Sequence, residues 1–159
     1  MKVVNRMRLT VPAKSVNESF LRAIAGCFAA QADPPCDLIS DVKTAVSEAV
    51  TNCIVHAYPN GGGEIIMAAK LTADGMLYIK ISDKGRGIPD VKKAMEPLFT
   101  TSTGGERSGL GFTVMQQFTD SVSVRSKPGK GTAVTLKKRL IAPEAEKGPG
   151  RKGHQGARN

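Results

Sequence analysis

The sequence predicts an α+β fold in which helices pack on one face of a mixed β-sheet. Two amphipathic helical patterns follow each other early in the chain, short stretches of alternating polarity come in pairs, and helices and strands do not alternate strictly. The chain has 159 residues, 40% of them hydrophobic, which is enough for one buried core without disulfides or a structural metal. We therefore expect a single folded domain over residues 1–140.

The first predicted elements are a strand and two helices. Residues 2–11 alternate like a strand, and a helix follows to about residue 31. Ser15 and Glu18 have the spacing of a capping box at the start of this helix. After a Pro-Pro break, apolar residues recur at three- and four-residue spacing over residues 38–57 and predict a longer second helix. A proline and a run of glycines end it.

The rest of the chain consists of strands, one helix and one long connection. Residues 84–111 contain six glycines and show no periodicity, and connections of this length are usually functional. The elements predicted around this connection are strands over residues 63–71 and 75–83, a helix over 112–120, and a closing hairpin with strands over 121–126 and 131–139.

The charge distribution limits the choice of partners. Residues 141–159 form a basic, Gly-rich tail that we predict to be disordered, and it contributes only part of the net charge of +9. The basic body suits an anionic ligand such as a nucleotide or an acidic protein partner, or it is simply a solvated surface. No basic stripe with interleaved aromatic residues and no helix-turn-helix pattern is present, so we expect no direct nucleic-acid partner.

The cysteines and the hydropathy pattern indicate a cytoplasmic protein without membrane contact. Cys27, Cys36 and Cys53 are odd in number and form no CxxC pair, which favours buried free thiols in a reducing compartment. No apolar stretch is long enough to span a membrane, and the first residues alternate in polarity where a signal peptide would be continuously apolar.

The first candidate for chemistry is a polar pair on the second predicted helix. Glu48 and Asn52 lie one turn apart, so their side chains project together. The carboxylate can accept a proton from an attacking hydroxyl, and the amide oxygen can ligate magnesium without adding charge. Taken alone, such a pair is more often part of a solvent-facing stripe.

The second candidate is the stretch SDKGRGIP, residues 82–89, which leaves a predicted strand. Gly85 and Gly87 permit backbone geometries that other residues resist, and they let a planar ring approach the main chain. Asp83 offers a carboxylate to an exocyclic amine. An ordinary turn at the end of a strand explains the same pattern without any ligand.

The third candidate is the segment PLFTTSTGGERSGLGF, residues 97–112. Gly109 and Gly111 stand at the start of a predicted helix, where free backbone N–H groups favour phosphate, and Arg107 is within reach of a terminal phosphate. Gly104 and Gly105 would let the preceding part move as a lid. A flexible surface loop with a helix cap is the simpler alternative. The segment is neither a Walker A loop nor a Rossmann fingerprint.

In combination, the three stretches resemble a known superfamily. EAVTN, DKGRGI and GLGF are similar to the N, G1 and G2 boxes of the GHKL ATPases, which include gyrase, histidine kinases and MutL. Their Bergerat fold places ATP between a helical layer and a mixed sheet. Within this superfamily residues 1–140 resemble the sporulation anti-sigma-F factors, a family of serine protein kinases, through the stretches NESFLRAIAGCFAAQ, VSEAVTNCIVHAYP, DKGRGIPD, EPLFTTS and ERSGLGFTVMQQFTDSVSVRS.

The resemblance implies an activity and roles for individual residues. The family binds a sporulation sigma factor as a homodimer with ATP and Mg²⁺, and it phosphorylates a serine on a STAS-type anti-anti-sigma factor. Glu48 would be the general base, Asn52 the Mg²⁺ ligand, and Arg22 a contact for the protein partners. The residues implied to contact ATP or ADP are Asn52, Asp83, Gly85, Gly87, Thr100, Thr101, Arg107, Ser108, Gly109, Leu110, Gly111 and Thr132.

Two other interpretations stay open at this point, and a third is disfavoured. In one, ATP only gates sigma binding, with little kinase activity; in another, the chain is a stress-response paralogue that uses the same partner switch. A detached histidine-kinase domain would need a phosphoacceptor histidine, but His56 lies inside the nucleotide helix and His154 in the tail. Lys84 and Arg86 depart from the family pattern beside the G1 glycines and put partner docking in question.

Overall fold

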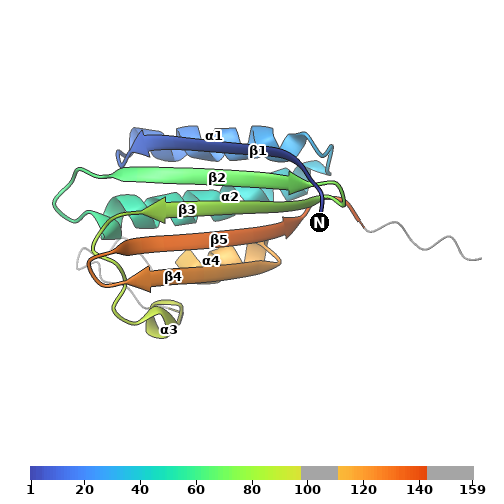
Figure 1. Cartoon of the computed structure of the whole chain (residues 1–159). Coiled ribbons are helices and arrows are strands. Elements are labelled where there is room, and N and C mark those ends of the chain that lie inside the picture. Colours follow the sequence, from blue (N-terminus) through green and yellow to red (C-terminus); the bar gives the residue numbers. More distant parts are fainter. Residues whose placement is uncertain (98–110, 143–159) are drawn as a thin grey trace, which may run out of the picture.

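The computed structural model describes residues 1–97 and 111–142, and it has two layers, a β-sheet in front and helices behind it (Figure 1). The expected tail after residue 142 lies outside the described residues. The elements in chain order are β1 Val3–Pro12, α1 Val16–Ala30, α2 Cys36–Asn52, the π-helix η1 Cys53–Ala57, β2 Glu64–Thr72, β3 Met76–Asp83, α3 Val91–Ala94, α4 Gly111–Phe118, β4 Ser121–Lys127 and β5 Gly131–Arg139.

The predicted α+β fold class is confirmed, but the sheet is antiparallel throughout and not mixed. Its strand order is β1-β2-β3-β5-β4. The paired helices α1 and α2 return the chain to the end of the sheet that it left, so β2 runs against β1 and Glu64 pairs with Pro12. The single helix α4 makes β4 run in the same direction as β3, but β5 lies between these two strands and runs against both.

The hydrophobic core fills the space between the two layers. Alternate residues of β2 and β3 point into it, as their burial patterns show, and α1, α2 and α4 each turn one apolar face toward the sheet. The largest fully buried apolar side chains are Leu21, Val46, Val50, Ile65, Met67, Leu77, Ile79, Ile81, Met115 and Leu140.

The ends of the two long helices differ from the prediction. Ser15 has helical dihedral angles and makes no side-chain cap, so the predicted capping box is wrong. Glu18 instead accepts a hydrogen bond from Ser47 of α2 at 2.5 Å. The second helix changes to a π-helix after Asn52, and the backbone N–H of Arg86 donates to the carbonyl oxygen of Ala57 at its end.

The cysteines and a short helix are further differences. Cys53 is buried as expected, but Cys27 and Cys36 are exposed, because both lie on the solvent-facing sides of their helices. The sequence pattern did not predict α3, whose first turn is capped by the carboxylate of Asp90. No helix within the described ranges is long and apolar enough to cross a membrane.

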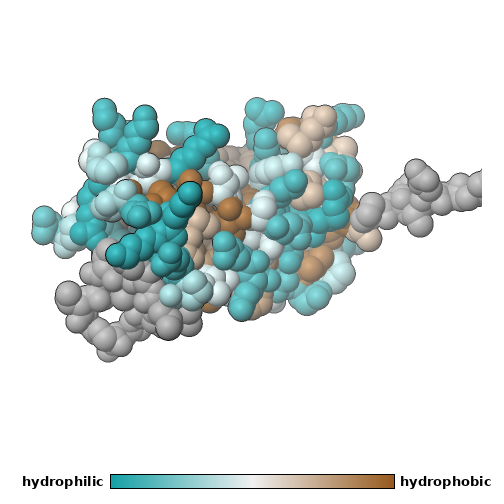
Figure 2. Space-filling model, turned by 90° about the horizontal axis from the view of Figure 1, so that it is seen from below, coloured by the Kyte–Doolittle hydropathy of each residue, from teal (hydrophilic) through white to brown (hydrophobic). Residues whose placement is uncertain are grey.

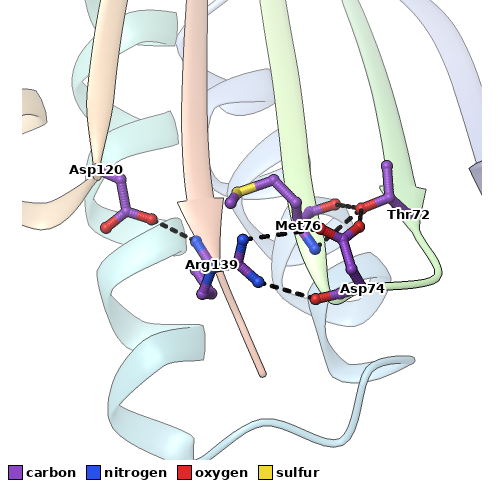
Figure 3. Close-up of polar contacts among 5 residues, drawn as sticks. All are labelled: Thr72, Asp74, Met76, Asp120 and Arg139. Atoms are coloured by element: carbon purple, nitrogen blue, oxygen red, sulfur yellow. Dashed lines mark hydrogen bonds and ion pairs between the residues drawn. The ribbon is translucent and has the colours of Figure 1, made fainter. Parts of the chain in front are cut away.

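Polar contacts hold together the end of the sheet where β2 turns into β3 (Figure 3). The Thr72 hydroxyl donates to Asp74, and the Met76 N–H donates to that hydroxyl at 3.1 Å. The hydrogen bond from Thr72 lowers the pKa of Asp74. Arg139 of β5 donates from its guanidinium to the Asp74 carbonyl oxygen at 3.0 Å and from its backbone to Asp120 at 2.6 Å. These contacts fix β5 beside the hairpin.

Replacement of Ile79 by alanine should destabilise the fold strongly. Ile79 is 2% exposed in the central strand β3, and truncation of such a side chain typically costs about 2–5 kcal/mol. Urea denaturation would measure the change in the free energy of unfolding. Val4→Ala is the control, because Val4 is 53% exposed and its truncation should change stability by no more than about 0.5 kcal/mol. Equal losses for the two variants would contradict this arrangement of the core.

Candidate functional site

Glu48 and Asn52 lie on the side of α2 that meets the start of α4. Both are partly exposed, whereas Val46, Ala49 and Val50 on the same helix are buried. A Cβ placed on Gly111 would lie 3.3 Å from Oε2 of Glu48 and 3.4 Å from Oδ1 of Asn52. The structure therefore brings together three of the predicted site residues, and glycine at position 111 lets α4 begin directly beside the polar pair.

Asp83 forms a second cluster at the end of β3. Its side chain is buried, with 8% exposure, and Oδ1 accepts hydrogen bonds from the backbone N–H groups of Gly85 at 2.9 Å and Thr132 at 3.2 Å. Asp83 and Thr132 are also paired across β3 and β5. A buried polar side chain needs hydrogen-bond partners, and these two backbone donors supply them for Oδ1. Asp83 and Gly85 thus meet Thr132, which lies 49 residues after Asp83 in the sequence, in one cluster.

The glycines after Asp83 are required by close backbone contacts. A Cβ on Gly85 would lie 2.3 Å from the carbonyl oxygen of Ala57, and a Cβ on Gly87 would lie 2.1 Å from that of Lys127. Gly87 also has a φ of +74°, which disfavours residues with a side chain. The turn is therefore held between the end of η1 on one side and the β4–β5 hairpin on the other.

Ser126 links this turn to the end of the hairpin. Its hydroxyl accepts a hydrogen bond from the N–H of Ile88 at 2.7 Å and donates to the carbonyl oxygen of Gly131 at 3.0 Å. The hydroxyl groups of Ser126 and Thr132 lie 2.8 Å apart. Ser126 was not among the predicted site residues, because a serine in a strand of alternating polarity gives no signal of its own.

Cys53 is a second residue that the sequence reasoning left out of the site. Its Sγ donates to Oδ2 of Asp83 at 3.5 Å, a long contact from a weak donor. Burial and then the neighbouring Asp83 raise the pKa of the Cys53 thiol well above its ordinary value, so it stays protonated at neutral pH. The position directly after Asn52 was a usable signal, but the apolar spacing of the helix assigned Cys53 to the core.

Tyr58 ties three segments together beside the Asp83 cluster. Its hydroxyl accepts a hydrogen bond from the N–H of Lys84 and donates to the carbonyl oxygen of Glu64, both at 2.8 Å. The side chains of Lys84 and Arg86, the two departures from the family pattern, are exposed next to this turn. The end of η1, the start of β2 and the turn after β3 are thereby fixed relative to one another.

Arg22 lies on α1 and forms an i, i+4 ion pair with Glu18 at 3.7 Å. Its side chain is 42% exposed, and Glu18 also accepts the hydrogen bond from Ser47, the residue before Glu48. Arg22 is therefore accessible, and a short series of polar contacts leads from it to the helix that carries the polar pair. An exposed ion pair of this kind contributes little to stability.

Six of the predicted ATP contacts belong to residues 98–110. Thr100, Thr101, Arg107, Ser108, Gly109 and Leu110 lie outside the described residues. Within the described ranges, no group of three or more His, Cys, Asp or Glu residues could hold a metal ion. Asn52 and Glu48 nevertheless fit the needs of Mg²⁺, which is usually held by one or two protein oxygens together with phosphates and water.

The arrangement suits a nucleotide better than a metal or a small apolar ligand. The first group is the buried carboxylate of Asp83, which lies beside η1 and accepts hydrogen bonds from the backbone. The second group is the pair Glu48 and Asn52, which precedes η1 in the chain and lies beside the start of α4. The first group can accept a hydrogen bond from a base. The second can hold a metal–phosphate group and accept a proton.

Comparison with known proteins gives matches along most of the chain. Residues 11–138 match the family model described as a histidine kinase-like ATPase domain. An anti-sigma F factor from Caldanaerobacter subterraneus subsp. tengcongensis is 54% identical over 87% of this chain and 96% of that protein. One from Geobacillus kaustophilus is 46% identical over 89% of this chain and 97% of that protein.

A solved structure agrees with the fold. The RsbU and RsbW domains of a Mycobacterium tuberculosis protein superimpose with a TM-score of 0.64, at 22% identity over 86% of this chain and 33% of that chain. At this identity the likeness concerns the two-layer architecture.

Gly85→Ala should destabilise the protein, because the added Cβ would collide with the backbone oxygen of Ala57 in η1 and not with a flexible side chain. Overpacking of this kind costs about 1–3 kcal/mol, measurable by chemical denaturation. Gly26→Ala is the matched control: its Cβ would lie close to side-chain atoms alone, Cγ and Cδ of the flexible Lys43 and, at 3.6 Å, Cγ2 of Ile39. Alanine also favours a helix over glycine by about 1 kcal/mol. If Gly85→Ala were as stable as Gly26→Ala, the close contact with Ala57 would be disproved.

Proposed function

Because the chain belongs to the histidine kinase-like ATPase family and, within it, to the anti-sigma F factors, we propose that it is a Mg²⁺- and ATP-dependent serine kinase that also binds a sporulation sigma factor. Its phosphate acceptor is a serine on a STAS-type anti-anti-sigma factor. The observation that carries the proposal is the placement of Glu48 and Asn52 beside Gly111 at the start of α4.

The Asp83 cluster is the proposed adenine end of the site. Oδ1 is already held by Gly85 and Thr132, which orients the carboxylate so that Oδ2 accepts the exocyclic amine. Only the Cys53 thiol, a weak donor, contacts Oδ2 among the described residues. The absence of a side chain at Gly85 and Gly87 keeps the turn close to η1 and the hairpin, which fixes the position of the carboxylate.

Glu48 and Asn52 form the proposed phosphate end. Mg²⁺, when bound with the nucleotide, neutralises charge that develops on the phosphates. Asn52 supplies an amide oxygen for it, and Glu48, one turn earlier, accepts the proton of the attacking serine hydroxyl. Both side chains are partly exposed, so a protein substrate can reach them from solvent.

Arg22 is the proposed contact for the protein partners. It is exposed on α1, and its neighbour Glu18 is bonded to Ser47 of α2. A partner bound at Arg22 would therefore lie near the helix that carries Glu48 and Asn52. The proposed active assembly is a homodimer, and residues 1–140 are its folded domain.

A nucleotide-gated binding module with little turnover is the second candidate. A binding module with little turnover needs no general base that a protein substrate can reach. The partly exposed Glu48 beside Asn52 therefore favours the kinase. A stress-response paralogue would have the same site and differ only in the sigma factor that it holds. ATP-dependent sigma binding without phosphorylation of any partner would favour the module.

Glu48→Gln should abolish phosphate transfer while ATP binding persists. Loss of a general base typically lowers the rate by about 10²–10⁴-fold. The assay follows labelled phosphate from Mg-ATP to the STAS protein, and calorimetry measures ATP affinity. Asn52→Ala should lose both transfer and Mg²⁺-dependent affinity. Asp37→Asn, a similar charge change at the exposed start of α2, is the control and should keep normal activity. Transfer that survives Glu48→Gln would exclude Glu48 as the base.

Asp83→Asn should reduce the preference for ATP over inosine triphosphate, which carries a carbonyl oxygen in place of the exocyclic amine. A hydrogen bond to a charged group contributes about 1.5–3 kcal/mol, so the wild-type protein should prefer ATP by roughly ten- to a hundredfold. The asparagine keeps an oxygen for Gly85 and Thr132 and places an amide donor at Oδ2. Competition binding measures the ratio of the two affinities. An unchanged ratio of the two affinities would mean that the purine base of the nucleotide does not bind at Asp83.

A further inference from the structure

One face of the sheet is not covered by helices. Helices α1, α2 and α4 lie behind the sheet and α3 lies beside its β4 edge, so no helix of the described residues covers the opposite face (Figure 1). Outward positions alternate with buried ones, as the burial pattern of β4 and the first residues of β2 show. In the view from below, where this outer face is at the top, hydrophilic side chains project along it (Figure 2).

The outward positions are strongly basic. Glu64, at the very start of β2, is the acidic residue among the outward strand positions. The basic residues at outward positions are Arg6 and Arg8 on β1, Lys70 on β2, Lys80 on β3, Arg125 and Lys127 on β4, and Lys137 and Arg139 on β5. We call these eight residues the basic sheet face.

The strand register brings three of these cations into one row around Tyr78. Arg6 is opposite Lys70, Lys70 is opposite Tyr78, and Tyr78 is opposite Lys137. The ammonium groups of Lys70 and Lys137 lie 4.7 and 5.8 Å from the centre of the Tyr78 ring. Like charges that lie opposite each other on a sheet destabilise it. The attraction of the lysine ammonium groups to the Tyr78 ring partly offsets this repulsion.

The one basic residue of the described strands that lies outside this face has an acidic partner. Lys138, which points toward the helices, forms an ion pair with Asp41 of α2 at 3.0 Å. On the basic sheet face, Arg139 pairs with Asp74 at 3.7 Å, and the other seven cations form no ion pair with any residue that the structure describes. Their charge is therefore left for solvent ions or a partner.

We propose that the basic sheet face binds the phosphate backbone of nucleic acid without sequence preference. Protein–protein interfaces are depleted in lysine and have an apolar centre, whereas nucleic-acid interfaces are polar and strongly positive. The centre of this face is a pair of lysines around one tyrosine. Because both lysines lie against the Tyr78 ring, contacts to phosphate are favoured over stacking of bases.

Nucleic-acid binding by this face departs from the expectation drawn from the sequence, which was that no nucleic acid binds directly. The cations belong to five strands that are separated along the chain, so no basic stripe can be read from the sequence. Only the antiparallel register places them on one surface. Outward residues on a strand are about 7 Å apart and neighbouring strands about 5 Å apart, which gives a dense array of cations.

The test compares two triple variants of the full chain with equal net charge. Lys70→Gln, Lys80→Gln and Lys137→Gln remove charge from the basic sheet face. Lys14→Gln, Lys43→Gln and Lys92→Gln remove the same charge from exposed positions elsewhere. Fluorescence anisotropy measures binding to a labelled duplex of about 20 base pairs over a series of salt concentrations, and circular dichroism checks that both variants are folded. Poly-glutamate of matched charge serves as a second probe.

The wild-type protein should bind the duplex with a Kd of about 10⁻⁴–10⁻⁶ M at physiological salt, as is usual for non-specific binding. In the sheet-face variant, the slope of log K against log salt should flatten by about 0.9 for each phosphate that the protein no longer neutralises. The control variant should keep most of the wild-type slope. Equal losses in both variants, or absence of binding at low salt, would overturn the proposal. Binding of poly-glutamate but not of the duplex would assign the face to an acidic protein instead.

Discussion

The buried carboxylate of Asp83 is the interaction on which the site depends. It lies at the end of a central strand, and its oxygens accept hydrogen bonds from the following turn, from β5 and from the thiol at the start of η1. A buried polar group is costly unless it is hydrogen-bonded, so these donors must stay in place for the fold to be stable. The same requirement fixes the position of the carboxylate for a ligand.

Close backbone contacts extend this constraint to the neighbouring segments. The turn after β3 touches η1 through Gly85 and the hairpin through Gly87, and Tyr58 adds hydrogen bonds to the turn and to β2. The polar pair on α2 directly precedes η1, so its position relative to Asp83 follows from the same contacts. Binding and chemistry would thus share one rigid support, and the exposed side chains of Lys84 and Arg86 lie outside it.

Much of the fold follows from local patterns in the sequence. Strands over residues 63–71 and 131–139 agree with β2 and β5 to within one residue, because alternating polarity on a half-buried sheet is a strong signal. The prediction that the side chains of Glu48 and Asn52 project together also rests on a local pattern, their spacing of one helical turn. Three features were not predictable, because each depends on a contact between distant segments. They are the hydrogen bond between Cys53 and Asp83, the π-helix, and the hydrogen bond from Ser47 of α2 to Glu18. The purely antiparallel sheet was missed for the same reason.

The position of β5 between β3 and β4 has a consequence for how the chain reaches its native state. The last strand of the described residues, β5, is inserted between two earlier ones, so β4 has no neighbour in the sheet until β5 is present. A nascent chain can close its helices and the first three strands early, but the second half of the sheet must wait for residues near position 139. Pairings between segments so far apart slow folding because the loops between them must close first. The sheet can therefore be completed only after β5 has been synthesised.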